Sequence, residues 1–354
     1  MPAIRYNIRD RLQNLVANLG TDRDKAASTF YATPMLDDQQ LSNMYRGAWL
    51  PRKIVDIPAL DACREWRGWQ ASSDQIEKIE AEEKRLAVQQ KVQEALTKAR
   101  LFGGAAIYIG TGDRDPTLPL NAEAIKRTGL KRLTVLTRRK LSATQVEQDI
   151  DSDRYGKPAA YTLPGGVVIH PSRLVIFLGN PHPDTELVAG AEFGWGDSVL
   201  LAIVDAIKNS DSTAANIASL VFEAKVDVIS IPEFMEKMGD PVFEKQMLER
   251  LRLAAMAKGI NGALLLDTLE TYSQKTANFA SLTDILMAFL QIVCGAADMP
   301  MTRLVGTSPG GLGSNGAGEL INYYDGIRAS QKLIIGPAMS VMCSNGCTVV
   351  RCSL

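Results

Sequence analysis

The 354-residue sequence predicts an α+β fold in which two long helices flank a small inserted domain. Short apolar runs bounded by turn residues lie in 101–179, as expected of strands. Apolar residues recur at helical spacing in 196–223 and 281–297, and the intervening stretch 224–280 holds a β-branched run and a further helix. A segment rich in Gly, Ser, Pro and Asn, 298–316, follows the second long helix.

Composition and charge exclude several classes of protein for this chain. Hydrophobic residues make up 46% of the chain and charged residues 22%, which is ordinary for a globular protein. The 39 basic and 40 acidic residues give a net charge of −1, which argues against tight wrapping of DNA because such binding depends on a basic surplus. The five cysteines form no CxxC pair, so no disulfide framework, metal site or cofactor is expected. The N-terminus lacks a signal-peptide core and no run is long enough to span a bilayer, so no membrane association is predicted.

The N-terminal half divides into a polar arm, 1–48, and an α+β layer, 49–195. Pro58 favours a helix that begins after it, because proline is well tolerated in a first helical turn. The charged, Ala- and Gln-rich stretch 73–100 predicts one continuous helix with a single apolar stripe. Strands are predicted within 101–110, 133–136, 159–163 and 165–179.

Basic and aromatic residues alternate near the end of the predicted helix that follows Pro58. Arg64 and Arg67 interleave with Trp66 and Trp69. Such a set can stack on nucleic-acid bases. Long charged side chains more often cover aromatic rings that pack inward, and we favour this structural interpretation.

The two histidines, His170 and His182, bear on a possible enzymatic function. A phosphodiesterase of the two-histidine type needs a pair of H-x-[ST] motifs, so that one imidazole acts as base and the other as acid. His170-Pro-Ser172 fits this motif, whereas His182 is followed by Pro and Asp184. With one motif only, we expect His170, Ser172 and Arg173 to form structural hydrogen bonds at a strand turn.

The segment 298–316 connects a helix to a further amphipathic helix, 317–342. Its composition permits positive φ and resists helix and strand formation. A phosphate-binding loop is excluded because Leu312 stands where that motif requires Lys. Two interpretations remain open: a flexible surface linker, or a loop held out from a rigid scaffold to carry function.

Four segments, in this order and spacing, make the chain resemble the portal proteins of tailed bacteriophages, in the portal-like family associated with anti-CBASS proteins. The segments are 52–59 with 64–66, 103–110, 170–173, and 300–316 with 323–328. The resemblance implies a portal-protein fold: an α/β wing, a two-helix stem, a small αβ clip, a tunnel loop and a long C-terminal helix. The corresponding ranges would be 49–195 for the wing, 196–223 and 281–297 for the stem, 224–280 for the clip, 298–316 for the tunnel loop, and 317–342 for the long helix.

The resemblance further implies function, partners and location. Subunits would form a homo-oligomeric ring, usually a dodecamer, that serves as the channel for packaging and ejection of double-stranded DNA, without catalysis. Its partners would be the terminase large subunit, a head–tail adaptor and a major capsid or scaffold protein. The protein would be made in the host cytoplasm and reside at the portal vertex of the virion.

Contacts with DNA in such a channel would be weak and non-specific, which agrees with the charge pattern. On the first stem helix Asp197, Asp205 and Asp211 outnumber Lys208, and acidic helices repel phosphate. Arg303 is the single cation near the loop. The candidate channel-loop residues are Thr302, Arg303, Thr307, Ser308, Gly310, Gly311, Ser314 and Asn315.

One part of the chain departs from the family pattern. Residues 343–354 have no helical period and hold three of the five cysteines, so we expect a truncated crown. Two alternatives to a portal subunit stay open. One is another virion component, such as a minor capsid or adaptor protein, which would not need both the inserted domain and the Gly-rich loop. The other is a cyclic-nucleotide phosphodiesterase, against which the missing second H-x-[ST] motif argues.

Overall fold

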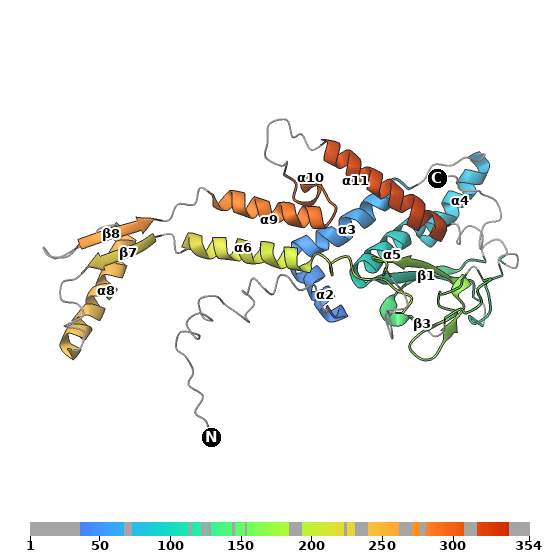
Figure 1. Cartoon of the computed structure of the whole chain (residues 1–354), viewed down its shortest axis with the longest axis horizontal. Helices are drawn as coiled ribbons and strands as arrows, with labels where there is room; N and C mark the ends of the chain where they lie inside the picture. The colour runs from blue at the N-terminus through green and yellow to red at the C-terminus, as the bar shows by residue number, and fades with distance from the viewer. Residues whose placement is uncertain are drawn as a thin grey trace, which may run out of the picture. The chain divides into compact units, whose positions relative to one another are not determined.

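The computed structural model describes residues 36–66, 73–112, 115–121, 125, 129–143, 146–152, 154–183, 193–222, 225–230, 240–261, 271–276, 281–307 and 317–339. The chain divides into two units, residues 1–207 with 292–354, and residues 208–291. The division falls within two helices, α6 (Val204–Phe222) and α9 (Leu282–Ala296). Figure 1 labels the elements in chain order.

A three-stranded antiparallel sheet forms the centre of the first unit. Its order is β2 (Arg132–Thr137), β1 (Gly104–Gly110), β6 (Leu174–Leu178). Helix α5 (Val88–Phe102) packs against this sheet, as Figure 1 shows. The central strand is buried along almost its whole length, which explains its run of small and apolar residues. The main core between helix and sheet includes Val92, Ala99, Ile107, Val175 and Phe177.

Helices α2 (Asp38–Gly47) and α3 (Trp49–Arg64) precede this layer. The prediction that a helix begins after Pro58 is wrong, because Pro58 lies inside α3. A proline there leaves the carbonyl of Ile54 without its intrahelical donor. Arg100 of α5 supplies the missing donors: its Nη2 donates to the Ile54 oxygen at 2.8 Å and its Nε to the Val55 oxygen at 3.2 Å.

The predicted helix over 73–100 is in fact two helices, α4 (Ser73–Leu86) and α5. Between them Ala87 adopts a left-handed conformation with φ of 52°. This reverses the backbone course while Lys91 N–H donates to the Ala87 oxygen and starts α5. The sequence offers no Gly or Asn at this position, so the break was not visible in it.

A second, smaller sheet of three short strands follows, β3 (Ser142–Ala143), β4 (Tyr161–Thr162) and β5 (Val168–Ile169). The strand predicted at 133–136 is confirmed as part of β2, and the strand predicted at 159–163 is confirmed over the two residues of β4. Two 3₁₀ turns, η2 (Arg138–Lys140) and η3 (Pro171–Arg173), connect the elements of this region. Tyr161 and Trp195 pack together in its core, with ring centroids 5.6 Å apart.

Three glycines meet where the chain leaves the sheet toward α6. The N–H groups of Gly179 and Gly196 both donate to the Gly103 oxygen, at 2.9 and 3.0 Å. A Cβ on Gly103 would collide with the Gly196 carbonyl, and Gly103 also has a φ of 86°. The hydrogen bond of Gly196 to Gly103 holds the backbone outside a helix at the residue where the sequence predicts that the long helix starts. The helix therefore begins at Val204 rather than Gly196, and Asp197 precedes it in a bridge with Asn180.

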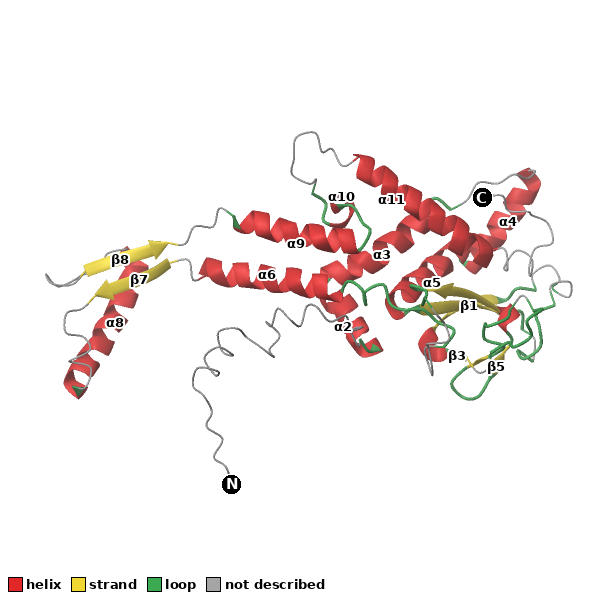
Figure 2. Ribbon diagram, viewed as in Figure 1, coloured by secondary structure: helices red, strands yellow, loops and turns green. Residues whose placement is uncertain are grey.

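The second unit contains most of α6 and α9, with β7 (Lys225–Ser230), α8 (Pro241–Asn261) and β8 (Thr271–Thr276) between them. Figure 2 shows β7 and β8 as an antiparallel pair. Lys225 pairs with Thr276, so the end of α6 and the start of α9 lead into the same end of this two-stranded sheet. The strand predicted at 262–267 lies outside the described residues.

The C-terminal elements return to the first unit. A short helix, α10 (Met301–Leu304), occupies the beginning of the predicted loop 298–316, so that loop is not irregular throughout. Its residues Met301 and Leu304 are buried, which accounts for the helical turn. Helix α11 (Ala317–Ser330) continues into a π-helical turn, η6 (Gln331–Ile335), and the helix extends to Met339.

Candidate functional site

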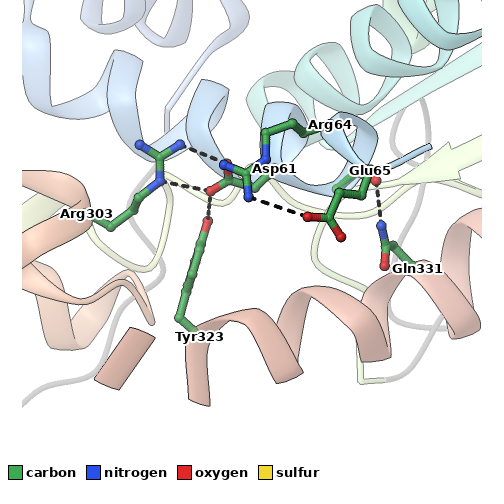
Figure 3. Close-up of polar contacts among 7 residues, drawn as sticks. Asp61, Arg64, Glu65, Arg303, Tyr323 and Gln331 are labelled. Atoms are coloured by element: carbon green, nitrogen blue, oxygen red, sulfur yellow. Dashed lines mark hydrogen bonds and ion pairs between the residues drawn. The ribbon is translucent and has the colours of Figure 1, made fainter. Parts of the chain in front are cut away.

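A buried carboxylate on α3 joins the two elements that flank the segment 308–316. The Asp61 side chain has no exposed surface and accepts two hydrogen bonds from Arg303 of α10, from Nε at 3.0 Å and from Nη2 at 2.8 Å. The hydroxyl of Tyr323, on α11, donates to the same carboxylate at 2.9 Å. We call these three residues the Asp61 cluster, and Figure 3 shows them converging on one carboxylate.

The electrostatics of the Asp61 cluster follow from this geometry. The hydrogen bond with Asp61 raises the pKa of Arg303 above its ordinary value. Burial raises the pKa of Tyr323, and its hydrogen bond with Asp61 raises it further. Both groups therefore stay protonated near neutral pH, and each can donate to the carboxylate. A buried carboxylate with a bidentate guanidinium partner is a satisfied structural ion pair.

Further contacts fix α10 and α11 to α3. Lys53 Nζ donates to the carbonyl oxygen of Leu304 at 2.8 Å, which satisfies an oxygen at the end of α10. Gln331 Nε2 donates to the Ala62 oxygen at 2.8 Å. The Arg64 guanidinium lies over the ring of Tyr324, 5.6 Å from its centroid.

The structure places the predicted channel-loop residues in different surroundings. Arg303 was predicted as a cation near DNA, but its guanidinium is committed to Asp61 and its side chain is only 29% exposed. Thr302 is half-buried in α10, and its hydroxyl has no partner among the described residues. Thr307 is exposed. Ser308, Gly310, Gly311, Ser314 and Asn315 lie outside the described residues.

The predicted stem residues divide between α6 and the segment before it. Asp205, Lys208 and Asp211 lie on α6 and are exposed. Asp197 lies before the helix, and its Oδ2 is 3.5 Å from Nδ1 of His182. The acidic character expected of the helix therefore rests on two of the three predicted aspartates.

His170 has the structural role that its sequence predicts. Its Nδ1 accepts from the N–H of Ser172 at 3.2 Å and lies 2.8 Å from the Ser172 hydroxyl, so His170 caps η3. Ser172 Oγ accepts from Leu120 N–H, and Arg173 Nε donates to the Leu118 oxygen. Burial lowers the pKa of His170, with the charges of Arg154 and Arg173 acting in the same direction. The imidazole is neutral and engaged in holding a turn.

Of the two tryptophans that alternate with arginines, Trp66 lies within the described residues, and it has a structural role. Trp66 packs against the main core, and its indole N–H donates to Glu83 at 3.2 Å. Trp69 and Arg67 lie outside the described residues.

In the described part of the chain no group of three potential ligands is placed to hold a metal ion, and no helix there is long and apolar enough to cross a membrane.

Sequence reasoning missed Asp61 and the role of Tyr323. Asp61 and Arg303 are 242 positions apart, so no local pattern connects them. The one available signal was Asp61 itself, an acidic residue between the apolar positions of a helix whose neighbours Ala59, Ala62 and Cys63 are buried. A carboxylate on such a face requires a partner from elsewhere in the fold.

Comparison with known proteins identifies relatives of this chain. A family model described as "Phage portal protein" matches residues 39–345. Proteins named "Anti-CBASS protein Acb1" from Caulobacter sp. (strain RHG1) and Sphingomonas paeninsulae are 40% and 39% identical over 347 and 342 residues, which cover 94% and 93% of this chain. The chain spans only 55% and 54% of those relatives. An uncharacterized protein of Haemophilus influenzae is 32% identical over 95% of this chain and 76% of its own length.

Solved structures show the same fold. A chain from the neck of an empty gene transfer agent (GTA) particle aligns with a TM-score of 0.54 at 14% identity, over 89% of this chain and 83% of the other. A chain from the neck of the native particle, with C12 symmetry, aligns with a TM-score of 0.50 at 13% identity, over 91% and 85%. The predicted portal-protein fold is thus confirmed. The chain belongs to the phage portal protein family. The family match points to the virion. The two neighbouring structures come from particle necks computed with C6 and C12 symmetry.

Proposed function

We propose that this chain is a portal subunit whose copies form the ring-shaped channel for packaging and ejection of double-stranded DNA at one vertex of a capsid. The observation that carries the proposal is the family match over residues 39–345. The ring would be a dodecamer and would contact the terminase large subunit, a head–tail adaptor and the major capsid or scaffold protein. DNA would pass without tight binding, since the chain has no basic surplus.

The proposed regions follow the elements of the structure. Residues 49–195 would form the wing, α6 and α9 the stem, and 224–280 the clip that meets motor and adaptors. Residues 298–316 would form the tunnel loop, and 317–342 the long helix toward the crown. The Asp61 cluster supports the assignment of the loop, because it fixes the elements on both sides of 308–316 to the wing helix α3.

The surface of α9 supports assembly of copies of the chain. Ile285, Ala288, Ile292 and Gly295 are exposed and recur at helical spacing, and Ile285 and Ile292 are 43% and 58% exposed. Asp284 is the single charged residue of the helix. An apolar stripe on a helix with so little charge is unfavourable in water, and contact with a neighbouring subunit would cover it.

The two relatives named Anti-CBASS protein Acb1 favour a second candidate, an anti-CBASS role for proteins of this type. These relatives are about twice as long as the stretch they share with this chain, so the activity in their name belongs to a larger protein. Within the described residues His170 holds a turn, which does not favour a phosphodiesterase. A minor capsid or adaptor protein is the remaining alternative.

Substitution on α9 tests the portal proposal. Ile292→Asp places a charge in the proposed subunit interface, where it would be desolvated, and we expect it to prevent ring formation at concentrations at which the unsubstituted chain assembles. Leu118→Asp is the matched control, because Leu118 is also 58% exposed but lies in a loop of the proposed wing. Native mass by light scattering is the measurement. Equal assembly of both variants would reject α9 as the interface.

A further inference from the structure

The two elements held by Asp61 are anchored to unequal degrees. Arg303 makes two charge-assisted hydrogen bonds with the carboxylate, at 3.0 and 2.8 Å, in the bidentate geometry that is the strongest of its kind. Tyr323 makes one hydrogen bond, at 2.9 Å, from a neutral hydroxyl. Breaking the first contact would leave a buried carboxylate without its charge partner, whereas breaking the second would leave the ion pair intact.

The packing of α10 and α11 shows the same asymmetry. Met301 and Leu304 of α10 are 3% and 0% exposed, and Lys53 binds the carbonyl at the end of the helix. Helix α11 has Tyr323 as its single buried residue over the whole of Ala317–Ser330. The hydroxyl that α11 presents to Asp61 therefore lies on the one fully buried residue of that helix, and Ile327 packs at the edge of the main core.

A π-helical turn follows α11 at Gln331–Ile335. Ile335, the last residue of this turn, and Ala338 and Met339 after it are buried in the main core, whereas before the turn the helix is largely exposed. A π-turn holds one more residue per hydrogen-bonded ring than an α-turn and is a local weakness in helix geometry. The turn thus separates a helical segment buried in the core from α11, which is held by the Tyr323 hydrogen bond, the contact of Arg64 with Tyr324 and the partly buried Ile327.

We propose that Asp61 is a positioning residue with one permanent and one releasable partner. Arg303 keeps α10 on α3, while Tyr323 lets α11 detach from the carboxylate and move about the π-turn. The inequality of the two anchors rests on the contacts alone.

Amide hydrogen exchange on the full chain tests this inference. Tyr323→Phe keeps the ring and removes the hydroxyl, and we expect exchange in 317–330 to rise about tenfold, the factor for one modest hydrogen bond to a charged group. Exchange in 301–305 should stay unchanged. Tyr324→Phe is the control on the neighbouring tyrosine and should change neither region. Asp61→Asn should raise exchange in both regions.

The outcomes separate the inference from the proposed function. An equal rise in both regions with Tyr323→Phe would overturn the inference, since the two anchors would then be coupled. Unchanged exchange in both regions would overturn it as well, because the hydroxyl would hold nothing. A double substitution, Asp61→Ala with Tyr323→Phe, should add nothing in 317–330 beyond Asp61→Ala alone, because alanine leaves the Tyr323 hydroxyl without this acceptor. Native mass measured on the same samples reports on ring formation. If the chain does not assemble but the exchange pattern is as expected, the portal proposal is rejected and the inference about the Asp61 cluster is retained.

Discussion

Arg100 donates a hydrogen bond to the carbonyl oxygen of Ile54 at 2.8 Å, and this oxygen is the one that a proline in the next helical turn leaves without a donor. A side chain from α5 thereby replaces the backbone bond that Pro58 removes from α3. Burial lowers the pKa of Arg100 to about 10. The proline and the arginine together fix α3, and with it Asp61, against the sheet layer.

Substitution of this pair should be non-additive. Arg100→Met removes the donor and is expected to lower the free energy of unfolding by about 1–3 kcal/mol, the cost of an unsatisfied buried carbonyl. In that background Pro58→Ala restores a backbone N–H that can reach the Ile54 oxygen. Its stabilising effect should exceed the effect of Pro58→Ala alone by about 1 kcal/mol in denaturant unfolding. Additivity within about 0.5 kcal/mol would contradict the account.

Alkaline pH should destabilise the first unit. Burial raises the pKa of Tyr161 to about 12, whereas an unfolded tyrosine ionises near 10, so the folded state binds this proton more tightly. The contribution is complete below pH 10 and is lost as the pH rises toward 12. At pH 11 the loss from this residue is about 1.4 kcal/mol.

Tyr161→Phe isolates this contribution. The variant should lose less stability than the unsubstituted protein between pH 8 and pH 11, by about 1.4 kcal/mol in the free energy of unfolding. Tyr155→Phe is the control, because Tyr155 is 57% exposed. Identical pH profiles for Tyr161→Phe and the unsubstituted protein would show that the ring does not titrate from the core.

The glycine junction before α6 should tolerate no side chain. A Cβ on Gly196 would collide with the carbonyl of Asn180, so Gly196→Ala is expected to reduce stability by about 1–3 kcal/mol. Gly326→Ala, in α11, meets no atom within 4 Å and should stabilise by about 0.5–1 kcal/mol through helix propensity. Thermal unfolding of both variants measures these two changes in stability, which are expected to have opposite signs. A neutral Gly196→Ala would mean that the chain can leave the sheet along another course.

The parts of the fold that the sequence predicts well are those set by local patterns. β2 and α9 match their predicted ranges to one residue at each end, and β4 falls within its predicted strand, because apolar periodicity decides these elements. The errors at Pro58, Ala87 and Gly196 share a different cause. In each case a contact or conformation of the folded chain, such as the Arg100 donors or the Gly103 carbonyl, overrides the local preference.

The candidate site was predictable in position but not in chemistry. The Gly-rich composition of 298–316 directs attention to a stretch that includes Arg303, one member of the Asp61 cluster. Arg303 was interpreted as a cation free to meet DNA because its partner, Asp61, lies 242 positions earlier in the chain. Tyr323 gave no signal of a hydrogen bond, since a tyrosine at helical spacing is also satisfied by ordinary packing.

The measurement that most directly tests the portal assignment is the mass of the purified protein in solution, by light scattering, with negative-stain images of the same fraction. The account predicts assemblies of about a dozen subunits, as expected of closed cyclic symmetry, with a central opening in each image. The relative from Haemophilus influenzae, which this chain covers over 76% of its length, should form the same kind of ring. A single monomeric species for both proteins at every concentration would contradict it.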